Sequence, residues 1–214
     1  MSLTVDVISD VVCPWCYIGK VKLQTAIDLF KKANPSAGDP IVRWHPFQLN
    51  PELDIDGVDR ADYVSQKFGD RAATVYDRVT NVGLEVGINF AFDKIQRQPN
   101  TRKAHSLIAA CEEAPLQERM VQALFDAYFI QARDLTDDAV LEQIAAEIGL
   151  PEQLINDALH SPGSISRIQR ADIQAREMGV QGVPFFVFNG RLAVSGAQAS
   201  DTLLQAMQEA CDSQ

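Results

Sequence analysis

The sequence predicts an α/β protein in which a small mixed β-sheet carries helices on its faces and a long helical block interrupts the sheet. Three observations support this fold class. Two short β-type runs near the start of the chain flank a helical segment, and a hairpin followed by a helix ends the chain. Between them, residues 52–175 show several helical patterns and no convincing strand.

The first unit is a strand, a helix and a second strand. Residues 4–9 are short and β-branched, which is typical of a strand. Residues 17–33 follow with helical spacing and end at Asn34 and Pro35. Residues 41–47 form the next strand, with Pro46 near its end or on a sheet edge because proline donates no ladder hydrogen bond. A helical crossover of this kind predicts parallel pairing of the two strands.

The helical block contains a series of separate segments. Asn100 is a good N-cap for one of them, and residues 136–138 (Thr-Asp-Asp) give another a cap and an acidic first turn before apolar residues at helical spacing. Gly149 and Pro151 separate that helix from the next one. The helical candidates are residues 61–81, 100–113, 116–132 and 164–178, together with the segment whose apolar residues repeat over 140–148.

The end of the chain changes character. Residues 182–188 are strongly β-type, and Asn189-Gly190 is the best local signal for a type I′ hairpin. Residues 191–195 form the return strand, and a last helix is capped by Ser200 or Asp201. The sheet-forming residues 1–51 and 176–214 are therefore expected to make one domain, with residues 52–175 inserted as a helical domain.

Composition excludes several function classes. The chain has 214 residues, 19 Lys plus Arg against 29 Asp plus Glu, and a net charge of −10. This acidity argues against nucleic acid and against docking on an anionic membrane surface as partners. The longest uncharged stretch, 178–190, is too short to span a bilayer. The first residues show no secretory signal, so we expect a cytoplasmic protein.

The most informative motif is Cys13-Pro14-Trp15-Cys16, between the first strand and the first helix. Pro14 suits the first helical position, which puts Cys13 near the N-cap at the positive end of the helix dipole. Such a position stabilises a thiolate, and Cys16 returns to the same face where it can attack a mixed disulfide. We expect Cys13 to be the exposed nucleophile and Cys16 the buried resolving thiol.

A metal site is not expected. Zinc would need two further ligands, and Cys111 and Cys211 stand alone in the sequence. His45, His105 and His160 show no paired spacing either. Both isolated cysteines are interpreted as core thiols.

The motif and its first helical residues, 13–19, resemble the active site of DsbA-family thioredoxin-fold proteins, in particular the FrnE-like branch. The resemblance continues at residues 44–51, at 99–101 with His105, and at 179–187, in the family's order along the whole chain. It implies a thioredoxin-like fold with a large all-helical insertion between the β-α-β and β-β-α halves. The 2-hydroxychromene-2-carboxylate isomerases and kappa-class glutathione transferases are related families with this fold.

The resemblance also implies details of the site. It implies that the Val183–Pro184 peptide bond is cis and lies beside the cysteine pair. It places the helix that carries Asn100, Thr101 and His105 over a substrate groove, where the imidazole would contact substrate or favour the Cys13 thiolate. The alternative for His105 is a purely structural role.

One position departs from the family pattern. Thioredoxins and many DsbA relatives carry a buried acid on the first strand, six residues before the nucleophilic cysteine, where this chain has Val7. We hypothesise that Asp10, or a water that it holds, accepts the proton of Cys16. The alternative is that Asp10 only stabilises the turn.

These observations leave three candidate functions. The leading one is a thiol–disulfide oxidoreductase or isomerase with no bound prosthetic group, acting on a disulfide-containing protein or a small thiol, with glutathione as a candidate co-substrate. The second is a glutathione-dependent isomerase or transferase, although those relatives typically carry Ser at the position of Cys13. The third is a non-catalytic module in which the cysteine pair senses redox state. The sequence makes no prediction of the oligomeric state.

Overall fold

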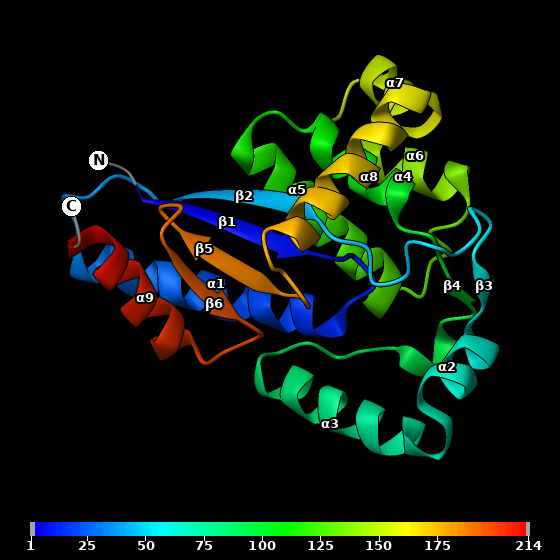
Figure 1. Cartoon of the computed structure of the whole chain (residues 1–214), viewed down its shortest axis with the longest axis horizontal. Coiled ribbons are helices and arrows are strands. Elements are labelled where there is room, and N and C mark those ends of the chain that lie inside the picture. Colours follow the sequence, from blue (N-terminus) through cyan, green and yellow to red (C-terminus); the bar gives the residue numbers. More distant parts are fainter. Residues whose placement is uncertain (1–2, 213–214) are drawn as a thin grey trace.

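The computed structural model describes residues 3–212 and contains the predicted mixed sheet (Figure 1). Its strand order is β2-β1-β5-β6, with β1 and β2 parallel and the other two pairs antiparallel. Residues 1–2 and 213–214, the outer ends of the predicted thioredoxin-like domain, lie outside the described part. The four strands are β1 (Thr4–Ser9), β2 (Ile41–Pro46), β5 (Phe185–Phe188) and β6 (Leu192–Ser195).

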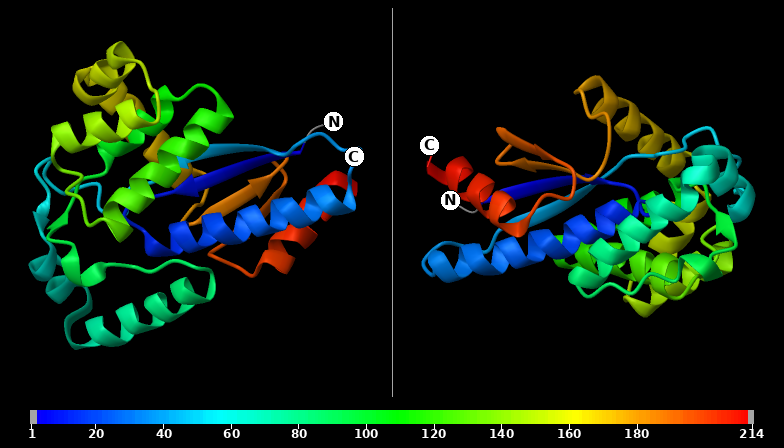
Figure 2. Two further views of the ribbon diagram at one scale, coloured as in Figure 1. Left: turned by 180° about the vertical axis from the view of Figure 1, so that it is seen from behind. Right: turned by 90° about the horizontal axis from the view of Figure 1, so that it is seen from below.

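Two helices cover one face of this sheet, α1 (Pro14–Ala33) and α9 (Ser200–Asp212) (Figures 1 and 2). They pack against each other, and α1 makes the crossover between the parallel strands β1 and β2. The hairpin turn has φ of 50° at Asn189 and 65° at Gly190, as a type I′ turn requires. Asn189 Oδ1 also accepts a hydrogen bond of 2.9 Å from Thr4 N, which ties the hairpin to the start of β1.

The long middle segment is mostly helical, as predicted. The elements are β3 (Val58–Asp59), α2 (Arg60–Phe68), η1 (Gly69–Arg71), α3 (Ala72–Glu85), η2 (Phe92–Lys94), β4 (Arg97–Gln98), α4 (Arg102–Ala110), α5 (Ala114–Phe125), η3 (Asp126–Ile130), α6 (Asp138–Glu147), α7 (Glu152–His160) and α8 (Pro162–Glu177). Helices α4, α5 and α8 contact β2, α3 packs against α1, and α8 crosses in front of β1 and β2 in the view of Figure 1.

Two expectations for this segment were wrong. It does contain strands, because β3 and β4 pair as a short antiparallel ribbon. Strands of two residues are too short to produce a periodic hydrophobic pattern. The single helix expected over 61–81 is two helices, because the chain turns at Gly69 with a positive φ of 52°.

The helical segment and the sheet share one continuous hydrophobic core. The ring of Tyr17 on α1 stacks on that of Phe125 on α5, with ring centroids 5.0 Å apart. Trp44 of β2 contacts the same phenylalanine edge-on, at 6.5 Å between centroids. Helix α8 also runs across residue 176, the expected second boundary between the domains. The division into two domains therefore stays a prediction.

Within residues 3–212, no helix is both long enough and apolar enough to cross a membrane.

Candidate active site

The cysteine motif lies where β1 passes into α1. The turn that joins them is closed by a hydrogen bond of 3.0 Å from Cys13 N to Asp10 O. Cys13 is the N-cap of α1 with extended backbone dihedrals (φ −95°, ψ 109°), and Pro14 occupies the first helical position. The structure therefore confirms the predicted placement of Cys13 at the positive end of the helix dipole.

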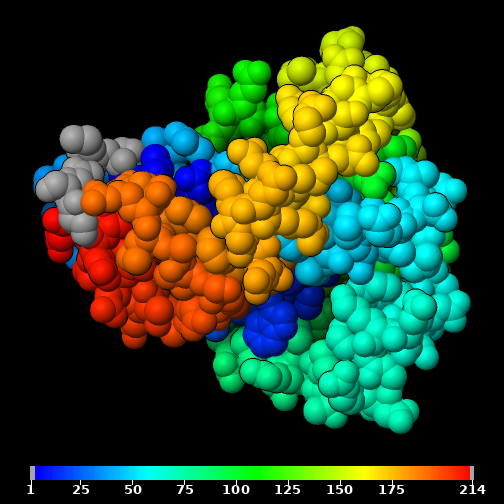
Figure 3. Space-filling model, in the orientation of Figure 1, coloured from blue at the N-terminus to red at the C-terminus, as the bar shows by residue number. Residues whose placement is uncertain are grey.

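Both cysteines of the motif are buried, so the expectation of an exposed Cys13 was wrong. The side chains are 4% exposed for Cys13 and 1% for Cys16. The loop before β5 lies across the helix start, with Cys13 Sγ 3.6 Å from Val183 O. The α2–α3 segment lies on the other side (teal in Figure 3, beside the blue N-terminal segment). The loop before β5 and the α2–α3 segment together cover Cys13 and account for its burial.

Cys13 nevertheless borders a cavity. This cavity of about 290 Å³ is lined by the helix start (Pro14, Trp15), by Val183, and by residues of α2, α3 and β4. A larger cavity of about 530 Å³ beside β2 is lined by no cysteine. The cavity beside Cys13 is therefore where a reacting group would lie.

The loop before β5 has the geometry that the resemblance implied. The Val183–Pro184 peptide bond is cis, and Val183 lines the cavity next to Cys13. Helix α1 approaches this loop closely at Gly19, where a built Cβ would lie 2.9 Å from Pro184 Cγ and 3.1 Å from the Phe186 ring. Only glycine fits this contact without movement of the loop.

We expect Gly19→Ala to destabilise the fold by about 1–3 kcal/mol, because the added methyl overpacks a buried contact. Chemical denaturation measures the loss directly. Gly163→Ala is the matched control, because its Cβ would meet only Ser161 Oγ at 3.5 Å, near the start of α8. Equal unfolding midpoints for the two variants would contradict the close packing of α1 on Pro184.

The environment of Cys16 keeps its thiol protonated. Burial raises the pKa of Cys16 well above its ordinary value, and the neighbouring Cys13 sulfur raises it further. Hydrogen bonds from the Ser9 side chain and the Asp10 backbone oppose this rise in pKa. The Cys16 thiol is therefore protonated near neutral pH and is a poor nucleophile in this state.

Asp10 forms a buried pair with His105 behind the motif. The Asp10 carboxyl is 1% exposed; its Oδ2 accepts a hydrogen bond of 2.8 Å from Leu49 N, and its Oδ1 lies 3.3 Å from His105 Nε2. Leu49 in turn lines the cavity beside Cys13. Asp10 therefore joins the motif, the loop after β2 and helix α4.

The residues assigned to a substrate groove lie elsewhere. Asn100, Thr101 and His105 are 3%, 4% and 3% exposed, and none of them lines the cavity beside Cys13. Asn100 Nδ2 donates to Leu53 O at 2.6 Å, which anchors the start of α4 to the preceding loop.

Sequence reasoning missed the residues that do line the cavity opposite Cys13. Arg60, Tyr63 and Lys67 come from α2, Tyr76 from α3 and Gln98 from β4. Their spacing in the sequence carries no motif, because the α2–α3 turn and the β3–β4 ribbon bring them together. Only the helical spacing of Arg60, Tyr63 and Lys67 on one face of α2 offered a signal.

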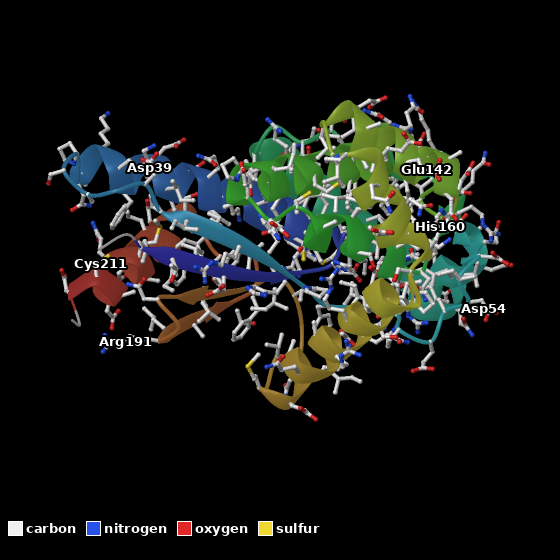
Figure 4. The ribbon with its side chains drawn as sticks, turned by 90° about the horizontal axis from the view of Figure 1, so that it is seen from above. Asp39, Asp54, Glu142, His160, Arg191 and Cys211 are labelled. Atoms are coloured by element: carbon white, nitrogen blue, oxygen red, sulfur yellow. The ribbon has the colours of Figure 1, made fainter. Side chains whose placement is uncertain are left out.

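The other two cysteines are placed away from this chemistry. Cys111 is 2% exposed, and burial raises the pKa of its thiol to about 11. Cys211 lies on α9 near the C-terminal end (Figure 4), and burial also raises its pKa. Among residues 3–212, no three His, Cys, Asp or Glu side chains converge as a metal site would require.

Comparison with known proteins gives a consistent result. Residues 4–208 match the family model described as DSBA-like thioredoxin domain. An uncharacterized protein of Bacillus subtilis, YwbO, is 24% identical over 98% of both chains. The crystal structure of a probable DsbA oxidoreductase from Streptomyces coelicolor superposes with a TM-score of 0.87 at 25% identity, covering 99% of this chain and 91% of that one. A 2-hydroxychromene-2-carboxylate isomerase shares the fold, with a TM-score of 0.70 at 16% identity over 98% and 97% of the two chains.

Proposed function

We propose that this chain, which belongs to the DSBA-like thioredoxin domain family, is a thiol–disulfide oxidoreductase or isomerase that acts through Cys13 and Cys16. The observation that carries the proposal is the position of Cys13. Its sulfur lies at the N-cap of α1, beside Val183 O, and borders a cavity that a disulfide could enter. Cys16 lies behind it, buried and protonated.

The reaction needs no bound prosthetic group. The Cys13 thiolate attacks one sulfur of a substrate disulfide, breaks the S–S bond and releases the other half as a thiolate. Cys16 then loses its proton and attacks Cys13 Sγ, which releases the second half of the substrate. The substrate has gained two electrons and the protein now holds a Cys13–Cys16 disulfide. An external thiol, for which glutathione is our candidate, reduces this disulfide and completes the cycle.

A coupled assay tests the proposal. The protein is given a small disulfide and glutathione, and the glutathione disulfide produced is recycled by glutathione reductase with NADPH. We expect NADPH consumption that depends on the protein and on both Cys13 and Cys16. Consumption no faster than without the protein would contradict the proposal.

The resolving step requires a proton acceptor, and we propose Asp10, acting through a water, for this role. In support, Asp10 is buried and its backbone contacts Cys16. Because the pKa of Cys16 is raised, its thiolate fraction and hence the resolving rate should increase with pH.

Asp10→Asn tests this role, since an amide cannot accept the proton but can still accept the hydrogen bond from Leu49 N. We expect resolution of a preformed Cys13 mixed disulfide to slow about 100-fold at pH 7, the lower range for loss of a general base. The rate should also need a higher pH to recover. An unchanged rate and pH profile, measured by rapid acid quench, would leave Asp10 with a purely structural role.

A second candidate function is a glutathione-dependent isomerase. The observation that favours it is the cavity of about 290 Å³ beside Cys13, whose size suits a small molecule. That chemistry needs one activated thiolate and no resolving cysteine. Turnover that survives Cys16→Ser would therefore favour it over the dithiol cycle.

A further inference from the structure

Arg60 is a buried cation without an anionic partner. Its side chain lies at the start of α2, and the residue is only 8% exposed. One guanidinium nitrogen donates to Gln98 Oε1 and another donates to the Tyr76 hydroxyl at 2.6 Å. Both acceptors are neutral, and within residues 3–212 no carboxylate lies within 4 Å of the guanidinium. A buried charge with only neutral partners is costly for the fold, which suggests that a ligand supplies the missing anion.

The unpaired guanidinium faces the same cavity as the nucleophile. Arg60 and Cys13 both line the space of about 290 Å³, and Lys67 is a second cation on its wall. No Asp or Glu is among the lining residues, although the whole chain carries a net charge of −10. The cavity is therefore a local cationic site in an acidic protein, which attracts anions to Cys13.

The other walls limit the size and shape of what can enter. The Tyr63 and Tyr76 rings lie 5.5 and 5.6 Å from the Arg60 guanidinium carbon, and Trp15 lines the cavity beside Cys13. The aromatic rings hold the guanidinium in place, so its planar donor group is pre-organised for a carboxylate. A volume of about 290 Å³ is at the lower end of ligand pockets, which run from about 300 to 1,000 Å³. It suits a small molecule rather than a folded protein.

We infer that Arg60 is a specificity-determining residue that binds a carboxylate of the substrate, and that the substrate class is a small anionic disulfide. The inference rests on the proposed function of Cys13. A guanidinium has five N–H donors, of which the two recorded bonds use two, so it can still bind a carboxylate through charge-assisted hydrogen bonds. The Cys13 thiolate then attacks the nearer sulfur, the substrate S–S bond breaks, and the other half leaves as a thiolate.

The test compares two probes of the same size that differ in charge, dithiodipropionate and its neutral diamide. The rate constant for oxidation of the reduced protein is measured with each. We expect the wild-type protein to react about 10- to 100-fold faster with the dicarboxylate, the ratio that a hydrogen bond to a charged group supplies. This preference should decrease with added salt, because salt screens the attraction. In Arg60→Gln the ratio of the two rates should fall by at least about tenfold, and Lys67 accounts for any preference that remains.

Two further variants make the result specific. Arg71→Gln removes the same charge from an exposed position in the same segment, outside the cavity, and should keep the wild-type ratio. Arg60→Lys keeps the charge and should retain part of the preference for the dicarboxylate. This variant still tests the inference if Arg60→Gln fails to fold. Equal wild-type rates with both probes would overturn the inference and leave the dithiol cycle intact. If neither probe oxidises the Cys13–Cys16 pair, the proposed function itself fails.

Discussion

Cys13→Ser is expected to lower the rate of disulfide exchange by at least about 1,000-fold, to the rate measured without protein. A serine hydroxyl at the N-cap of α1 stays protonated at neutral pH, so the helix dipole and the cavity have no anionic nucleophile to stabilise. Cys16 cannot replace it, because burial and the neighbouring sulfur raise the pKa of Cys16 well above its ordinary value. The coupled assay with a small disulfide and glutathione measures the loss.

Cys211→Ser is the matched control for this variant. Cys211 is partly exposed on α9, far along the chain from the motif, and burial raises its pKa. It should keep the wild-type rate. If Cys13→Ser retained more than a tenth of the wild-type rate, a different group would have to be the nucleophile.

Cys16→Ser is expected to stop the cycle halfway and to accumulate a mixed disulfide on Cys13. The first attack needs only the Cys13 thiolate, whereas release of the bound half needs the second sulfur. We expect the adduct to live at least about 100-fold longer than in the wild-type protein. This corresponds to an increase of about 2.7 kcal/mol in the activation free energy of its release. Intact-protein mass spectrometry after alkylation measures its amount over time.

The position of the adduct decides between the candidate roles. Peptide mapping should locate it on Cys13, with Cys111 unmodified because that thiol is buried and its pKa is about 11. An adduct on Cys111, or one released as fast as in the wild-type protein, would contradict the assignment of Cys16 as the resolving thiol.

Local signals in the sequence predicted much of the site. Pro14 after Cys13 marks the first turn of a helix, and Asn189-Gly190 marks a hairpin, because each of these pairs fixes backbone geometry over a few residues. The structure contains both features at those positions. The order of strands and helices followed from similar local patterns.

Long-range contacts could not be predicted in this way. Asp10 and His105 were each identified as candidates, but their pairing joins residues far apart in sequence and depends on how α4 packs against β2. The burial of Cys13 likewise depends on the α2–α3 segment and on the Val183 loop. Arg60 was missed because a single arginine on an amphipathic helix has no distinguishing pattern until the fold buries it.

A redox titration of the thiols tests most directly whether Cys13 and Cys16 act as one cycling dithiol pair. The protein is equilibrated in glutathione buffers of graded potential, free thiols are alkylated, and each cysteine is quantified by mass spectrometry. We expect one reversible two-electron transition in which the free thiols of Cys13 and Cys16 are lost together, with a midpoint between about −270 and −120 mV. Cys111 and Cys211 should stay reduced across that transition. Independent loss of the two motif cysteines, or a persistent glutathione adduct on Cys13 with Cys16 still free, would contradict it.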